Sequence, residues 1–197
     1  KMGGLRKHMP TTFWTFVAAT VAIAGIPPLA GFVSKDMILA KAFEAGLTDL
    51  NGYGTVYFLL WGLGLAGAAL TAFYMFRLVY MTFFGSFRGG EHAEHHLHES
   101  PWTMTLPLQV LAVLSIVGGL LIGFPGQLFH LEGWSLIDRF MAPVVLSHGE
   151  HGHHAVSFAL EWGLVVVSVA AAVAGILVAR RFYLLDPSFA KPRALAE

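Results

Sequence analysis

Residues 25–36 read Gly25-Ile26-Pro27-Pro28-Leu29-Ala30-Gly31-Phe32-Val33-Ser34-Lys35-Asp36, and they interrupt an apolar run that begins at residue 10. Proline removes a backbone donor, clashes with the preceding helical turn and pushes the residue before it out of helical geometry. Two half-helices joined by unwound backbone are therefore expected. The predicted break consists of Gly25, Pro27, Pro28 and Gly31.

Composition indicates a membrane protein. The 197 residues are 56% hydrophobic and 12% charged, whereas about 25% of the residues in soluble domains are charged. Twelve basic residues balance twelve acidic ones, so no overall charge field favours nucleic acid. The absence of cysteine excludes disulfides and cysteine-held metal clusters from the chain. We expect lipid, and no nucleic acid, as a partner.

Four apolar segments are long enough to cross a bilayer, which takes about 20 residues per helix. Lipid offers the backbone no hydrogen-bond partners, so each segment must be helical. We predict an all-α integral membrane protein, one membrane domain over residues 1–197, with four transmembrane spans of which the first is discontinuous. The predicted spans cover residues 10–46, 54–84, 104–124 and 155–181.

Basic residues are unevenly distributed between the connections. Nine lie in or near the two chain ends and the second connection, which follows the span 54–84: Lys1, Arg6, Lys7, Arg77, Arg88, Arg180, Arg181, Lys191 and Arg193. The intervening connections carry only Lys41 and Arg139. Because cytoplasmic loops keep an excess of Lys and Arg, both ends of the chain are expected to face the cytoplasm.

Lys35 is the main candidate for chemistry. A charge inside a bilayer is costly and usually serves a pathway, and burial makes a lysine's proton easier to lose, which suits a proton relay. Asp36 would be the local acid, near the positive amino end of the second half-helix. In the alternative reading, a straight helix from residue 10 leaves Lys35 among the lipid headgroups, as an interfacial residue.

Three weaker candidates remain. Arg77 can pair with an intramembrane carboxylate or extend to lipid phosphates, and Glu161 is either a relay or an interfacial residue. Histidines cluster in residues 89–100 and 147–154. Both tracts lack cysteine and regular spacing, so we expect solvated loops and no metal site.

Six motifs point to a known family: Met2-Gly3-Gly4-Leu5-Arg6-Lys7-His8-Met9-Pro10, Ala24-Gly25-Ile26-Pro27-Pro28-Leu29-Ala30-Gly31-Phe32, Ser34-Lys35-Asp36, Tyr74-Met75-Phe76-Arg77, Phe83-Phe84-Gly85 and His98-Glu99-Ser100-Pro101. Together they resemble the L-subunit family of respiratory complex I, which is related to the large subunits of Mrp-type antiporters and to membrane-bound hydrogenases. The resemblance covers residues 1 to about 183.

The resemblance implies an antiporter-like subunit fragment in the inner (plasma) membrane, with Lys35 as a proton relay on a broken helix. NADH, flavin, iron–sulfur clusters and quinone would be bound by other subunits, and this chain would hold no cofactor. Expected partners are the other membrane subunits, together with the missing amino-terminal half and carboxy-terminal lateral helix of the same subunit. As an isolated fragment the chain is not expected to pump protons.

Two rival functions remain open. A subunit of a cation/proton antiporter or of a membrane-bound hydrogenase would keep the same lysine. A structural membrane anchor would leave Lys35 interfacial, and its substitution would change nothing.

Overall fold

A computed structural model describes residues 3–49, 52–90, 96–122, 140 and 157–185. Helices are the only regular elements within these ranges, so the prediction of an all-α membrane fold with a discontinuous first element is confirmed. The elements are the 3-10 turn η1 (Leu5–Lys7), α1 (Pro10–Ala24), α2 (Ala30–Thr48), α3 (Gly54–Phe83), α5 (Trp102–Ile122), α7 (Phe158–Arg180) and the π-helical turn η2 (Arg181–Leu185).

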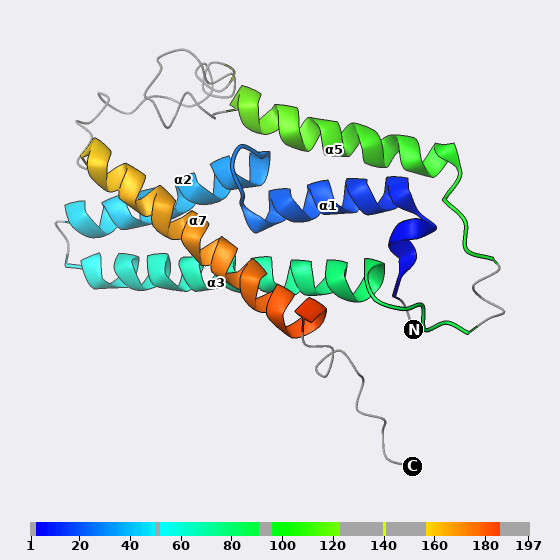
Figure 1. The fold of residues 1–197 in the computed structure, drawn as a ribbon. Coiled ribbons are helices and arrows are strands. Elements are labelled where there is room, and N and C mark those ends of the chain that lie inside the picture. Colours follow the sequence, from blue (N-terminus) through cyan, green and yellow to red (C-terminus); the bar gives the residue numbers. More distant parts are fainter. Residues whose placement is uncertain (1–2, 50–51, 91–95, 123–139, 141–156, 186–197) are drawn as a thin grey trace.

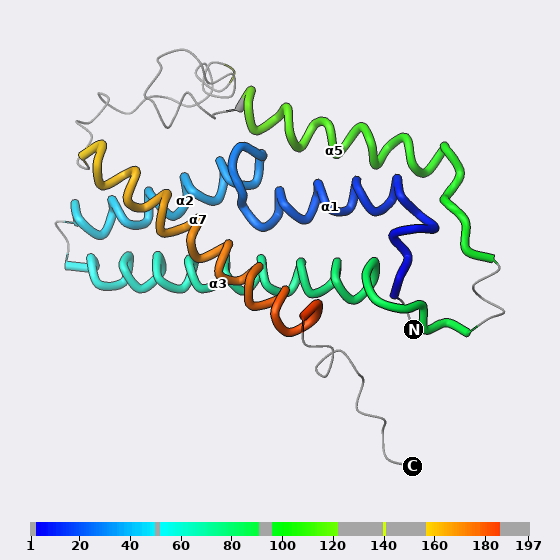
Figure 2. Tube along the Cα trace, in the orientation of Figure 1, coloured from blue at the N-terminus to red at the C-terminus, as the bar shows by residue number. Residues whose placement is uncertain are grey.

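The helices form a bundle around the two halves of the broken element (Figure 1). α1 and α2 follow each other in the same direction, and α3 returns antiparallel beside both (Figure 2). α5 packs on α1 and reaches α2, while α7 crosses α3 obliquely. The broken element is therefore covered on several sides by continuous helices.

Within the described residues, three helical segments are long and apolar enough to cross a membrane: α3, α5 and the continuous run of α7 with η2. α1 is apolar but shorter, with 15 residues. Together α1 and α2 extend along the 30-residue α3 (Figure 1), which supports one crossing by the two halves in sequence. Large apolar side chains are exposed on the outside of these helices, as lipid contact requires.

Small residues let the helices approach closely near the break. Ala24, Ala72 and Ala172 come from α1, α3 and α7, and each is at most 1% exposed. A second cluster joins Phe32 and Val33 of α2 to Val165 of α7. Because lipid provides no hydrophobic force between helices, close packing of this kind determines how membrane helices associate.

The structure around the break differs from the prediction in two respects. The non-helical backbone runs from residue 25 to 29, and Gly31 already lies in the first turn of α2. Gly31 is needed there because a Cβ would overlap the Ala22 carbonyl oxygen. Placing Asp36 near the amino end of the second half-helix was wrong: α2 begins at Ala30, so Asp36 is its seventh residue.

Candidate functional site

The carboxyl end of α1 is closed by its own backbone and by a side chain. Gly25 has a left-handed φ of 79°, and its N–H donates to the Ala22 carbonyl at 3.0 Å. The N–H of Ile26 donates to the Val21 carbonyl at 3.3 Å. This pair of bonds is the Schellman arrangement that glycine permits at a helix end. The carbonyl of Ile23, in the same last turn, requires a donor from elsewhere.

Lys35 supplies that donor. Its Nζ donates to the Ile23 carbonyl oxygen at 2.9 Å, across the break from α2 to α1. The stem of the lysine lies against Gly25, where a Cβ would be 3.3 Å from Cδ and 3.5 Å from Nζ. The half-buried ammonium therefore occupies the negative end of the α1 dipole, a favourable place for a cation.

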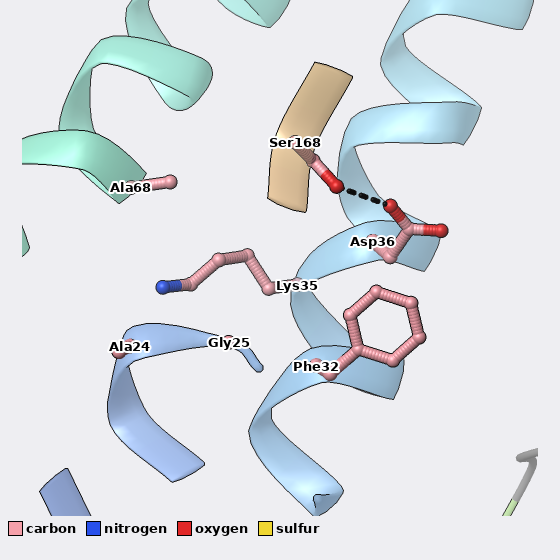
Figure 3. Close-up of a pocket in the computed structure, with 7 residues that line it drawn as sticks. All are labelled: Ala24, Gly25, Phe32, Lys35, Asp36, Ala68 and Ser168. Atoms are coloured by element: carbon pink, nitrogen blue, oxygen red, sulfur yellow. Dashed lines mark hydrogen bonds between the residues drawn. The ribbon is translucent and has the colours of Figure 1, made fainter. Parts of the chain in front are cut away.

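Asp36 points away from Lys35 and toward α7 (Figure 3). Its Oδ1 accepts a hydrogen bond from Ser168 Oγ at 2.9 Å. Sequence reasoning missed Ser168, although it is the only hydroxyl residue in the apolar α7 helix, a signal that could have drawn attention to it. The two neighbouring charges thus have partners on two different helices.

A small cavity lies between these groups, with a volume of about 10 Å³. Its lining consists of Ala24, Gly25, Phe32, Lys35, Asp36, Ala68 and Ser168 (Figure 3). Space of this size admits about one water molecule, provided that polar partners are present. The ammonium, the carboxylate and the hydroxyl supply such partners, so the cavity is suited to passing a proton between a side chain and water.

Arg77 and Glu161 lie away from this cavity. The Arg77 guanidinium is 5.3 Å from the ring centroid of Tyr183 in η2, and it makes no ion pair within the described ranges. Glu161 lies in the first turn of α7, where a carboxylate is favoured by the helix dipole. It is seven residues before Ser168, hence on the same face and roughly 10 Å away along the axis. Their roles as relays stay predictions.

Glu99 closes the amino end of α1, a role that sequence reasoning did not assign. Its carboxylate accepts hydrogen bonds from the Thr11 and Thr12 N–H groups at 2.7 and 3.4 Å, and from Thr12 Oγ1 at 2.6 Å. Partial burial raises the pKa of Glu99, but these bonds and one from the Ser100 N–H outweigh it and hold the pKa below the usual value. The carboxylate replaces the side-chain cap that Met9 cannot provide.

Metal ligands do not cluster in the part of the chain that the structure describes, where no three His, Asp or Glu residues gather. The predicted histidine-rich loop 147–154 lies outside the described residues, as do residues 91–95 of the loop 89–100.

Comparison with known proteins places these features in a family context. Residues 1–60 match the family model described as NADH:quinone oxidoreductase/Mrp antiporter, TM. NAD(P)H-quinone oxidoreductase chain 5 of Picosynechococcus sp. is 43% identical over 95% of this chain. NADH-quinone oxidoreductase subunit L of Mycobacterium tuberculosis is 41% identical over 93% of the chain, and that of Rhodobacter capsulatus 35% identical over 75%.

These relatives are much longer than this chain. The alignments cover 28% of the Picosynechococcus protein, 25% of the Mycobacterium tuberculosis protein and 20% of the Rhodobacter capsulatus protein. The broken helix falls within the region matched by the family model, since it ends before residue 60.

Proposed function

Because this chain is a homologue, over most of its length, of the chain 5 and subunit L proteins of NAD(P)H- and NADH-quinone oxidoreductases, we propose that it forms part of a proton-translocating membrane subunit. Proton movement through it would be coupled to NADH oxidation and quinone reduction in other subunits. Lys35 would be the relay, with Asp36 as its local acid.

The observation that carries this proposal is the bond from Lys35 Nζ to the Ile23 carbonyl at the break. The carboxyl end of α1 stabilises the protonated lysine without a fixed counter-ion. The adjoining cavity of about 10 Å³ has room for about one water molecule beside the ammonium. A lysine held by a carbonyl can give up its proton and return to the same position, as a relay requires.

Cofactors would be bound by other subunits, and this chain would contact other membrane subunits and the rest of its own subunit. It would lie in the inner (plasma) membrane with both ends cytoplasmic. η1 and η2 both pack on the carboxyl half of α3, so the basic groups of η1, α7 and η2 lie at the same end of the bundle. This supports the orientation, because basic residues are in excess on the cytoplasmic side of a membrane protein.

An antiporter subunit is the second candidate, since the description of the matching family model includes Mrp antiporters. The oxidoreductase is favoured because the relatives that align with most of the chain carry oxidoreductase names. A quinone-linked pump would lose proton translocation in step with NADH oxidation when electron transfer is inhibited. An antiporter would continue to exchange cations along an imposed gradient.

The decisive experiment replaces Lys35 by alanine in the complete complex. Proton pumping by inverted membrane vesicles is measured with NADH oxidation in the same sample. If Lys35 is the relay, protons pumped per NADH fall severalfold at equal complex content. Normal pumping and oxidation would instead assign Lys35 to the membrane interface and favour the anchor.

Lys41 provides a matched control on the same helix. Its side chain is 76% exposed and pairs with Glu44 at 2.6 Å, so it lies outside the proposed path. Lys41→Ala removes the same charge from α2 and should leave pumping per NADH unchanged. An equal loss in both variants would point to a general effect of charge on α2 and would contradict a specific relay.

A further inference from the structure

Ser168 is a polar side chain in an apolar helix, and its partner is the candidate acid. We infer that Ser168 is a positioning residue: its hydroxyl holds the Asp36 carboxylate against α7 and so prevents it from pairing with the Lys35 ammonium. This inference rests on the proposed function of Lys35 as a relay and adds a residue to that site.

Helix geometry separates the two charges first. Consecutive residues of a helix are turned by about 100°, so their side chains do not face each other. Lys35 accordingly donates to the Ile23 carbonyl at 2.9 Å. Asp36 lies on the other side and accepts from Ser168 Oγ, also at 2.9 Å (Figure 3). Both still line one cavity of about 10 Å³, so a carboxylate released from Ser168 has the ammonium within the same space.

Charge explains why the separation matters. An opposite charge in contact stabilises the ionised form of a lysine. If Asp36 turned to Lys35, the ion pair would retain the proton on the lysine and would compete with the Ile23 carbonyl for the ammonium. A relay must release that proton in each cycle. Keeping Asp36 on α7 leaves Lys35 with a neutral partner.

Packing determines where the Ser168 hydroxyl lies. Val165, one turn earlier, is buried against Phe32 and Val33 of α2, which sets the rotation of α7 relative to α2. The hydroxyl also lies 3.0 Å from the Val165 carbonyl of its own helix, a common partner for a helical serine. The Ser168 hydroxyl can therefore bond either to Asp36 or to the backbone of its own helix, and the experiment must distinguish these two roles.

The experiment compares Ser168→Ala with Ser168→Thr in the complete complex, again by pumping per NADH in inverted vesicles. Alanine removes the donor, whereas threonine keeps it, so we expect a severalfold loss in the first variant and at most a twofold loss in the second. Thr71→Ala is the matched control, because the Thr71 hydroxyl donates to the Gly67 carbonyl within α3. It should pump as the wild type does.

Another variant that weakens the donor is needed in case Ser168→Ala prevents the complex from assembling. If Ser168→Ala lowers the content of complex, Ser168→Cys is used, since a thiol is close in size but a weak donor. Infrared spectra with ¹³C-labelled aspartate report the frequency of the carboxylate band, which a change in packing alone would not shift. A carboxylate band that is absent in Asp36→Asn should shift in Ser168→Ala or Ser168→Cys and return in Ser168→Thr.

Three outcomes would overturn the positioning role: normal pumping without the donor, equal losses in the alanine and threonine variants, or an unshifted carboxylate band. Lys35→Ala distinguishes this failure from failure of the proposed function. If Lys35→Ala abolishes pumping while Ser168→Ala leaves it intact, the relay stands and only the inference about Ser168 fails. If Lys35→Ala pumps normally, the proposed function itself fails.

Discussion

The Lys35 ammonium nitrogen lies 2.9 Å from the Ile23 carbonyl oxygen, so a side chain of α2 completes the last turn of α1. The two residues are 12 positions apart, with the whole break between them. The lysine thereby supplies a donor to a carbonyl that the helix itself leaves without one. Any change in the break should therefore also change the environment of the ammonium.

Gly25→Ala tests that dependence. Alanine would take on a left-handed φ, at a cost of about 1–2 kcal/mol, and its Cβ would lie 3.3 Å from Lys35 Cδ. We expect pumping per NADH to fall severalfold at equal complex content. Gly52→Ala is the control, because Gly52 has a φ of 84° but open space around it. An equal loss of pumping in Gly25→Ala and Gly52→Ala would show that backbone strain alone is the cause.

Gly119→Ala tests the support of the break by α5. A Cβ there would overlap the Pro28 carbonyl oxygen and lie 2.6 Å from the Ala30 nitrogen. Overpacking of this kind costs about 1–3 kcal/mol, so the midpoint of thermal inactivation of the purified complex should fall. Gly62→Ala, where a Cβ meets open space, should leave the midpoint unchanged. Identical midpoints for the two variants would contradict a close contact of α5 with the break.

Glu99→Gln tests the closure of the amino end of α1. The pKa of Glu99 is below its ordinary value of 4.5 in the fold, so its contribution to stability is complete above that value and declines as the pH falls through the lower, folded pKa. Wild type should be more stable than the variant at pH 7, by up to about 1 kcal/mol. The difference between the thermal midpoints of the two complexes should narrow as the pH falls below 4.5 and vanish below the folded pKa. A gap that is independent of pH would show that charge is not the cause.

Single cysteines test the orientation of the chain, which contains none of its own. Ser86→Cys lies after α3, at the basic end, and Tyr53→Cys lies before α3 at the opposite end, where the Tyr53 side chain is 64% exposed. A membrane-impermeant maleimide should label Ser86→Cys in inverted vesicles and Tyr53→Cys in intact cells. The parent protein without either cysteine is the control. The reverse pattern would place both chain ends outside the cytoplasm.

Local sequence determined the helical fold and the place of the break. Long apolar runs must be helical in lipid, because no other local structure pairs the backbone there. The proline pair at residues 27 and 28 excludes a continuous helix by removing donors and by steric clash. These effects act within a few residues, so the interruption and the lysine after it were predictable without any knowledge of packing.

The partners of the charged groups were decided only by tertiary structure. Lys35 and Asp36 are neighbours in sequence, yet one bonds to α1 and the other to Ser168, which is 132 residues from Asp36. Glu99 reaches Thr11 across 88 residues. Such contacts depend on how each helix is rotated and translated against the next, which follows from close packing of many small residues rather than from any local motif.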